Sequence, residues 1–411
     1  MKKINKSNKK KVDPGIRIFG VGEEISNDSR GTGLNNNDLI IGGSGSGKTG
    51  GYVVPAIQNI SGSLVVSDTK GQLEKRFRKE LEKKGYNVYL IDFVHPERSD
   101  GYNPLDYIVR MPDGNLREKD ILSIAAVLCP QLDQKEPIWC MCAKLYVAFL
   151  IGYCLENDEI TEKNLHKVCD LRREFSQKDG DLLFSKWLSE HKDSFSARKY
   201  SEIIVNKPAD KMWASIEGFV NAFLEPLECR EMDYIFRNEN NIDLNVLGQE
   251  KTVLFINQSD TDRAFDPLVT LLHKQILQVL CEQADQNEKN EFRLDVPVRM
   301  ILDDFAAGCA IPDFDKIISV IRSRDISVNL MIQSLSQLNT LYDQSMADTI
   351  INNCDNLLYL GSNDPRTAGY LSLRADVSEE TIHSMPINKA YLFRSREKGR
   401  MIDRIIPYST L

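Results

Sequence analysis

The stretch Leu39-Ile-Ile-Gly-Gly-Ser-Gly-Ser-Gly-Lys-Thr49 decides the fold of this 411-residue chain, because a glycine-rich loop follows a short apolar strand directly. Residues 42–49 match the pattern G-x-x-x-x-G-K-S/T, in which glycines let successive backbone N–H groups curl around a phosphate. The pattern predicts that Lys48 reaches the β- and γ-phosphates of a nucleotide and that the Thr49 hydroxyl binds magnesium. A helix expected from about Lys48 adds the partial positive charge of its N-terminus. The predicted nucleotide-binding residues are Gly42, Gly43, Ser44, Gly45, Ser46, Gly47, Lys48 and Thr49.

Short apolar runs rich in β-branched residues recur on both sides of this loop. They are continuously apolar rather than alternating, which is typical of strands buried on both faces of a parallel sheet. Amphipathic segments of helical length, such as 71–84 and 266–285, lie between several of them. This alternation predicts an α/β fold with a central, mostly parallel sheet. The expected strands are 38–41, 63–67, 88–93, 252–257, 298–302, 328–332, 357–361 and 391–394.

The middle of the chain interrupts the alternation. Between 113 and 248 the sequence carries long segments of helical period and little that resembles a strand, as in 119–128, 138–155, 182–191 and 209–227. We therefore expect an all-helical insertion that divides one α/β domain in two, and we expect its many aromatic side chains to form its core. The predicted units are a basic, polar and partly disordered N-terminal segment (1–30), the N-terminal half of the nucleotide-binding domain (31–112), the helical insertion (113–248) and the C-terminal half of the nucleotide-binding domain (249–411).

A second candidate element is the apolar run that ends in two acids at Asp303 and Asp304. In nucleotide-hydrolysing proteins, a strand of this kind places one carboxylate on magnesium and the next near the attacking water. Asp303 is the predicted metal ligand, and Asp304 is the candidate for polarising water. A capping aspartate at a strand end is the plainer interpretation of such a pattern when it stands alone. Together with the phosphate loop it favours a nucleotide site.

Three polar residues around the next expected strand complete the candidate site. Gln333 follows that strand at its carboxyl end, where ligands lie in open α/β sheets, so it could sense the γ-phosphate, orient water, or simply close the strand. Arg322 and Arg324 precede the strand. An arginine supplied across a subunit boundary would stabilise charge on the transferring phosphoryl group, whereas ordinary surface pairing is the alternative.

Composition narrows the function classes. The chain is 42% hydrophobic and 27% charged with a net charge of −8, which excludes a protein coated with positive charge but leaves room for a local basic channel. Nine cysteines without a C-x-x-C pair, and five histidines, argue against a disulfide framework or structural zinc and favour reduced thiols in the cytosol. The most apolar uncharged run, 145–155, is shorter than the ~20 residues of a membrane span. We therefore expect no transmembrane segment in this chain, and the basic residues 1–13 precede no apolar stretch of a signal peptide.

Several motifs together resemble those of one family. They are IGGSGSGKT (41–49), VVSDTKGQL (65–73), GYNPLDYI (101–108), RMILDDFA (299–306), RSRDISVNLMIQSLSQL (322–338) and GSNDPRTAGYLS (361–372). In this order they resemble the TraG-type coupling proteins of type IV secretion, which are conjugative DNA-transfer ATPases. Lys48 and Thr49 fall on that family's first nucleotide motif, Asp303 and Asp304 on its second, and Gln333 on its glutamine motif.

The resemblance implies a RecA-like P-loop NTPase interrupted by an all-alpha domain, with ATP and Mg²⁺ as cofactors. It also implies a homo-hexamer, monomeric when isolated, that is cytoplasmic and peripheral at the inner face of the cell membrane. Such a ring drives relaxase-bound single-stranded DNA from the relaxosome to the proteins of the transport channel. The resemblance names no DNA-contacting residue in this sequence.

The sequence departs from the family pattern in three places. Asp304 stands where the family usually has Glu, so the carboxylate is one methylene shorter, and Asp68-Thr-Lys-Gly71 replaces Asp-Pro-Lys-Gly. The usual N-terminal transmembrane region is also missing, which leaves a soluble variant, a separate membrane anchor protein or a shortened chain as explanations.

Two other functions remain open at this point. An FtsK- or HerA-like double-stranded DNA motor shares the fold, although the motifs at 101–108 and 361–372 favour the coupling family. A docking protein that binds nucleotide without hydrolysing it is favoured only by Asp304.

Overall fold

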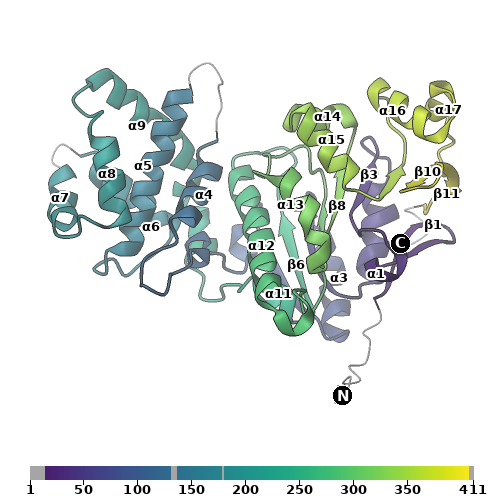
Figure 1. Cartoon of the computed structure of the whole chain (residues 1–411), viewed down its shortest axis with the longest axis horizontal. Coiled ribbons are helices and arrows are strands. Elements are labelled where there is room, and N and C mark those ends of the chain that lie inside the picture. The colour runs from purple at the N-terminus through teal and green to yellow at the C-terminus, as the bar shows by residue number, and fades with distance from the viewer. Residues whose placement is uncertain (1–13, 131–136, 178–179, 407–411) are drawn as a thin grey trace, which may run out of the picture.

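Nine strands form one sheet whose centre is parallel (Figure 1). The computed structural model describes residues 14–130, 137–177 and 180–406, so the basic residues 1–13 lie outside the described residues. The spatial order is β11-β10-β9-β3-β8-β7-β4-β6-β5, with β10 antiparallel to both of its neighbours. All eight strands expected from the sequence are present. The strands are β3 (Asp38–Ile41), β4 (Ser63–Asp68), β5 (Asn87–Asp92), β6 (Thr252–Asn257), β7 (Val298–Leu302), β8 (Ile326–Ile332), β9 (Asn356–Tyr359), β10 (Lys389–Arg394) and β11 (Arg400–Asp403).

Three neighbouring strands position the candidate site. The last residue of β3, Ile41, lies beside Ile332 at the end of β8, and Leu302 at the end of β7 pairs with Leu330. Because β3, β8 and β7 are parallel, their carboxyl ends meet at one edge of the sheet. The phosphate loop follows β3, Gln333 follows β8, and the two acids follow β7. This edge is called the carboxyl edge below, and the opposite one the amino edge.

One face of the sheet is covered by a few helices and by an N-terminal hairpin that the sequence did not predict. The hairpin, β1 (Ile16–Gly20) and β2 (Glu23–Ser26), forms a separate two-stranded sheet within the segment 1–30. It is ordered because Phe19 and Ile25 are buried against this face. Helices on this side are α2 (Val54–Gln58) and α3 (Leu73–Lys83), while α1 (Ser29–Thr32) follows the hairpin.

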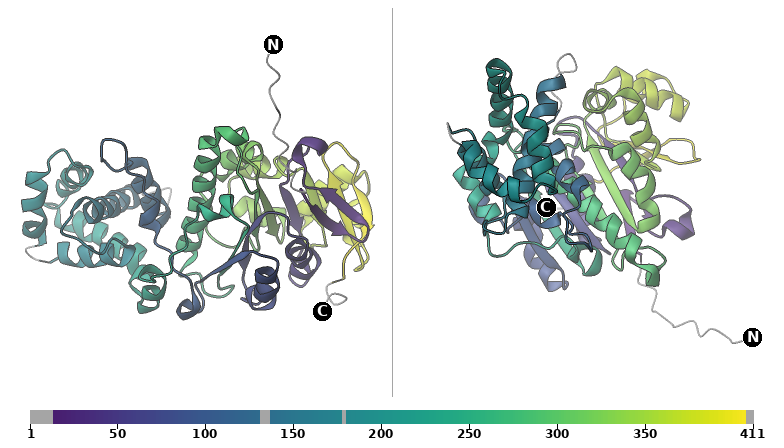
Figure 2. Two further views of the ribbon diagram at one scale, coloured as in Figure 1. Left: turned by 90° about the horizontal axis from the view of Figure 1, so that it is seen from below. Right: turned by 60° about the vertical axis from the view of Figure 1, so that its left-hand side comes forward.

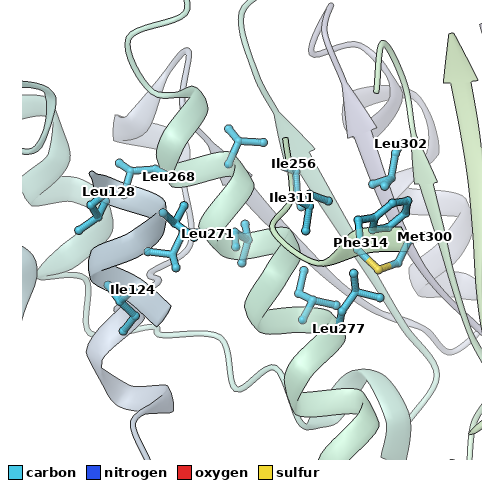
Figure 3. Close-up of a cluster of buried hydrophobic side chains, with 14 of the residues drawn as sticks. Ile124, Leu128, Ile256, Leu268, Leu271, Leu277, Met300, Leu302, Ile311 and Phe314 are labelled. Carbon is cyan, nitrogen blue, oxygen red and sulfur yellow. The ribbon is translucent and has the colours of Figure 1, made fainter. Parts of the chain in front are cut away.

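The second face carries the larger number of helices. Figure 3 shows α12 (Asp266–Gln286) between the sheet and the helical region: Leu271 and Leu277 lie among side chains of β6, β7 and α4. Each buried leucine or isoleucine of this cluster contributes about 1.5–3 kcal/mol, so the cluster joins the two regions in one core. The other helices that contribute to the core on this side are α13 (Phe314–Val320), α14 (Leu335–Leu341), α15 (Gln344–Asn352), α16 (Pro365–Ala375), α17 (Glu379–His383) and α11 (Val246–Gln249).

A region made of helices lies beside the α/β region (Figures 1 and 2). Between β5 and β6 the described residues form α helices and short 3₁₀ turns but no strand. Tyr146, Phe149 and Phe175 pack against one another in its centre, with ring centroids 5.3–6.4 Å apart. The helices are α4 (Glu118–Leu128), α5 (Pro137–Glu156), α6 (Leu165–Phe175), α7 (Gly180–Glu190), α8 (Phe195–Ile204), α9 (Asp210–Leu224) and α10 (Asp233–Phe236).

Helix α5 is the one described helix long and apolar enough to cross a membrane by length and composition. It extends the uncharged run of 145–155 toward the N-terminus, past Lys144. Its most apolar window is 72% buried inside the protein, where α4, α8 and α9 surround it. Helix α5 therefore forms the core of the helical region, as a buried core helix of this length does.

Two chain segments connect the helical region to the α/β region, and they lie side by side. Gly101 pairs with Asn241 in an isolated parallel bridge, and the Tyr107 hydroxyl donates to the Ile242 carbonyl at 2.8 Å. A Cβ on Gly101 would lie 2.1 Å from Asn241 Oδ1, so this close approach requires glycine. The Asn103 amide donates to the Lys163 carbonyl at 2.9 Å. The motif GYNPLDYI at 101–108 therefore forms the junction between the two regions.

Candidate nucleotide-binding site

The loop after β3 has the backbone of a phosphate-binding loop. Gly45 and Gly47 have φ of +73° and +79°, which side chains with a Cβ rarely adopt. A Cβ on Gly42 would lie 2.3 Å from Ser46 Oγ, so the loop has no room for one. Neighbouring strands fix the entry to the loop, because Gly42 N donates to Ile332 O and Gly43 N to Gly361 O. The expected helix starts as a π turn over Thr49–Val53 and continues as α2.

Lys48 and Thr49 lie at the end of the loop. Lys48 is 9% exposed, and its Nζ donates to the Gly42 carbonyl at 2.7 Å. No carboxylate among the described residues forms an ion pair with it, so a main-chain oxygen occupies the position where a phosphate oxygen would bind. The Thr49 hydroxyl donates to Asp303 Oδ2 at 3.2 Å. The structure thus brings the two predicted metal ligands into contact.

Asp303 and Asp304 lie at the end of β7. Asp303 is buried, and burial together with the neighbouring Asp304 raises its pKa to about 6. The Asp304 amide donates to Asp303 Oδ1 at 3.0 Å and orients that carboxylate. Asp304 itself has φ of +48°, a left-handed conformation that costs a non-glycine residue about 1–2 kcal/mol. The side chain of Asp304 is half-buried and lines a small cavity together with Asp303.

Oxygen ligands at this edge fit a magnesium nucleotide. Mg²⁺ prefers one or two protein oxygens and takes the rest from phosphates and water. Thr49 and Asp303 supply such oxygens, while Lys48 supplies the positive charge for phosphates. No cluster of three or more His, Cys, Asp or Glu suited to a metal occurs in the portion of the chain that the structure describes. The donor set therefore fits a metal that is held jointly by the loop and its nucleotide.

Gln333 comes directly after β8, between the strands that carry the loop and the acids. Its backbone amide donates to Gln337 Oε1 at 3.2 Å, and its side chain is half-buried. The structure therefore places Gln333 at the same edge as Lys48 and Asp303.

Arg322 and Arg324 lie at the amino edge, away from the loop of their own chain. They belong to a 3₁₀ turn, Ile321–Arg324, that leads into β8. Arg324 forms a bidentate ion pair with Asp285, at 2.8 and 3.0 Å, which raises the pKa of the guanidinium. Arg322 is exposed and donates one hydrogen bond, to the Ser29 carbonyl at 3.1 Å. The structure therefore does not bring Arg322 or Arg324 to the phosphate loop of the same chain.

Sequence reasoning missed one residue of the site, Arg404. It follows the edge strand β11, and its Nη2 donates to the Ser46 carbonyl of the phosphate loop at 2.6 Å. Nothing in the local sequence marks it, because the contact spans 358 positions of the chain.

It also missed a small cavity of about 30 Å³ behind the acids. His273 and Asp266 of α12 line it together with Asp303 and Asp304. His273 is buried, which lowers its pKa to about 4, and its Nε2 lies 3.0 Å from Ser67 Oγ. Burial raises the pKa of Asp266 to about 6. The carboxyl edge therefore carries three carboxyl groups and a neutral histidine around one cavity.

Comparison with known proteins identifies the family. The sequence pattern of the family described as "Type IV secretory system Conjugative DNA transfer" matches residues 2–402, nearly the whole chain. This chain belongs to that family. The resemblance of its motifs to coupling proteins of type IV secretion is thereby confirmed.

Relatives in the family are distant in sequence. Protein VirD4 of Agrobacterium fabrum (strain C58) is 23% identical over 343 residues, which make up 81% of this chain and 48% of VirD4. VirD4 of Rhizobium rhizogenes gives the same identity and coverage. The chain spans about half the length of the curated relatives it matches.

Solved structures show the same fold. The plasmid coupling protein TrwB, in complex with the non-hydrolysable GTP analogue GDPNP, has a TM-score of 0.70 at 14% identity, covering 95% of this chain and 89% of TrwB. TrwB in complex with ADP and Mg²⁺ gives the same values. VirB4 of Thermoanaerobacter pseudethanolicus has a TM-score of 0.56 at 11% identity, covering 97% of this chain and 98% of VirB4. The predicted RecA-like α/β fold is confirmed.

Proposed function

We propose that this chain is the ATP-hydrolysing motor of a conjugative coupling protein, with ATP and Mg²⁺ as its cofactors. One observation carries the proposal: in a member of the conjugative DNA transfer family, the phosphate loop, the acid pair and Gln333 lie at the ends of three adjacent strands. Membership of the family supports the coupling task. TrwB, which shares the fold, was solved with ADP and Mg²⁺ and with analogues of ATP and GTP.

Each residue of the carboxyl edge has a role in this proposal. The loop amides and Lys48 bind the β- and γ-phosphates, and Thr49 and Asp303 hold magnesium, which neutralises charge on the phosphate oxygens. Asp304 polarises the attacking water, and Gln333 senses the γ-phosphate or orients that water. The place of Asp304 beside Asp303 in the lining of the small cavity supports this role in spite of its shorter side chain.

The amino edge is the part of the molecule that we propose faces the next subunit. We propose a homo-hexameric ring in which Arg322 of one protomer reaches the nucleotide of its neighbour, as a head-to-tail contact allows. Arg322 lines a cavity of about 350 Å³ at the amino edge together with Arg293 and Arg299. Four arginines and two aspartates, Asp28 and Asp325, line the cavity, and this excess of positive charge suits the phosphates of a neighbouring subunit. Arg324 is the weaker candidate, since Asp285 already pairs with it.

The wider task follows from the family alone. We propose that the ring moves single-stranded, relaxase-bound DNA from the relaxosome to the transport channel at the inner face of the cell membrane, with a separate membrane anchor as one mode of attachment. The net charge of −8 places no general positive coat on the chain. DNA contacts are therefore expected inside the ring, where they are local.

ATP turnover with and without DNA tests the proposal. At about 50 mM salt, where phosphate contacts are strong, single-stranded DNA should increase turnover several-fold. Lys48→Ala should lower turnover at least about 100-fold, because it removes the positive charge that binds the β- and γ-phosphates. Lys289→Ala, on an exposed lysine far from the loop, is the matched control and should leave turnover unchanged.

Three results would contradict the proposal or one of its components. Turnover indifferent to DNA would exclude the motor. Stimulation by double strands alone would favour a motor of the FtsK or HerA kind. Nucleotide binding without turnover by the assembled wild type would leave a docking protein.

A further inference from the structure

We propose that Arg404 binds the phosphate chain of the nucleotide held by residues 42–49 of the same chain, so that the last strand of the sheet contributes to the nucleotide site. The inference rests on the nucleotide binding proposed above and assigns a residue that lies outside every recognised motif.

The position of Arg404 is fixed by the edge of the sheet. It follows β11, whose Ile402 pairs with Ala390 of β10, and its amide donates to the Asn388 carbonyl at 3.2 Å. The next residue passes over the start of the helix after the loop, since a Cβ on Gly51 would lie 3.2 Å from the Ile405 carbonyl oxygen. The guanidinium therefore reaches the loop from a backbone that is held on both sides.

Arg404 is largely buried, yet its guanidinium has no anionic partner among the described residues and keeps N–H groups that are open to a ligand. Its residue is 9% exposed, and no carboxylate of the described residues forms an ion pair with it. Burial alone lowers the pKa of this group. By contrast, Arg400 on the same strand forms a bidentate pair with Glu23, and the buried Arg17 pairs with Asp38 at 2.6 Å. A buried charge without a partner is costly, so it is kept where an anion arrives from outside.

The hydrogen bonds of Arg404 leave room for that anion. A guanidinium has five N–H donors, and the structure gives this one a single acceptor, the Ser46 carbonyl. Lys48 shows the same arrangement on the same loop, with the Gly42 carbonyl as its acceptor. Both cations thus hold main-chain oxygens of a loop built to surround phosphate. Arginine favours phosphate because its planar fork can donate two parallel bonds to it.

Binding of a fluorescent nucleotide tests the inference. We would titrate 2′/3′-O-(N-methylanthraniloyl)-ATP and the corresponding ADP into the wild type and into Arg404→Gln, Arg404→Lys and Arg400→Gln. A hydrogen bond to a charged group is worth about 1.5–3 kcal/mol, so Arg404→Gln should raise both dissociation constants by about 10- to 100-fold. Arg404→Lys, which keeps the charge, should restore much of the affinity. Arg400→Gln, the control on the same strand, should bind as the wild type does.

The melting temperature of each variant without nucleotide separates binding from loop support. Removal of an unpaired buried charge should leave that temperature unchanged or raise it, while the shift caused by added ATP shrinks. Wild-type affinity in Arg404→Gln would overturn the inference and leave nucleotide binding intact. Equal losses in the Gln and Lys variants, with a lower melting temperature in both, would make Arg404 only a support of the loop and also overturn it. A wild type that binds neither nucleotide would overturn the proposed function as well.

Discussion

Both ends of β3 carry charged groups, but the two ends use them differently. At the amino end the buried Asp38 carboxylate accepts hydrogen bonds from Arg17 at 2.6 Å, Tyr52 at 2.5 Å, Asn329 at 2.6 Å and Asn356 at 2.9 Å. All these partners come from the chain itself, and each one ties a neighbouring element to the central strand. This cluster has no site left for a ligand on the carboxylate.

At the carboxyl end the charges lack such partners. Lys48 and Arg404 contact only carbonyl oxygens of the loop, and Asp304 has a strained backbone. If stability alone determined these positions, we would expect each charge to have an ionic partner or to be replaced by an apolar side chain. At the amino end of β3 the charged group is paired within the chain and stabilises the fold. At the carboxyl end the charged groups lack ionic partners, as is expected where a ligand binds.

Arg322 is the exception to this division, because it lies at the amino edge and yet has a proposed catalytic role. An arginine supplied across a subunit boundary is worth about 1,000-fold or more in turnover. We expect Arg322→Ala to lower turnover of the assembled ring by that order and to leave nucleotide affinity within a few-fold. Turnover and fluorescent-nucleotide titration measure the two quantities. Arg324→Ala, beside it, is the control, and an equal effect of both substitutions would contradict the assignment.

Asp38 tests the structural end directly. Asp38→Ala leaves the Arg17 guanidinium buried without its partner, and breaking such a pair costs about 3–5 kcal/mol. We expect the free energy of unfolding in denaturant to fall by that amount while the folded protein keeps its nucleotide affinity. Asp376→Asn removes the charge that pairs with Lys398 at an exposed position and keeps a side chain that tolerates the left-handed backbone there, so it should leave stability nearly unchanged. A similar decrease in the free energy of unfolding of both variants would show that the burial of the Asp38 ion pair does not determine the size of its contribution.

Asp304 tests the catalytic end. Asparagine has the same shape and adopts left-handed backbone readily, so Asp304→Asn removes the charge without adding strain. We expect kcat to fall by about 100-fold or more, as for loss of a general base, with little change in nucleotide affinity. Asp313→Asn is the matched control, because Asp313 is exposed and has a φ of +60°. Turnover unchanged in Asp304→Asn would remove Asp304 from the proposed mechanism.

The smallest expected effect is that of His273 on the pH dependence of the free energy of unfolding. Its pKa is lowered from 6.5 to about 4 in the folded protein, so the unfolded chain binds a proton that the folded chain does not between these values. The free energy of unfolding therefore falls as pH decreases through this window, by about 1.5 kcal/mol from pH 6.5 to pH 5 for this group.

His273→Gln should lack this component of the pH dependence. The raised pKa values of Asp303 and Asp266, which line the same cavity, have the opposite sign, because protonation of these acids favours the folded state. Their effect is common to both proteins, so it cancels in the difference between wild type and variant. Denaturant unfolding at about pH 6.5 and pH 5 measures that difference. Parallel pH profiles would show that the pKa of His273 is the same in the folded and the unfolded protein.

The strands of the sheet centre were predictable because burial on both faces makes them continuously apolar, as in β6 and β8. The strands that were missed lie at the margins. Only Ile402 of β11 is buried, and β2 buries only Ile25, so neither has an apolar run. Alternation over such a short strand is hard to distinguish from a loop.

The candidate site divides in the same way. Lys48 and Asp303 could be chosen from the sequence because each lies a fixed number of residues from a strand end. The contact between Arg404 and Ser46, and the left-handed backbone of Asp304, depend on how distant segments meet. Such features follow from the folded chain, so no local pattern could have indicated them.

The paired connections at Gly101 and Asn241 have an evolutionary consequence. Because the chain leaves and re-enters at neighbouring positions, the helical region can be lengthened, rebuilt or exchanged for another without moving a strand of the sheet. The sequence of the helical region can then diverge between lineages faster than that of the sheet. The constraint on any such exchange is local: whatever replaces the region must begin and end beside a glycine that tolerates no side chain.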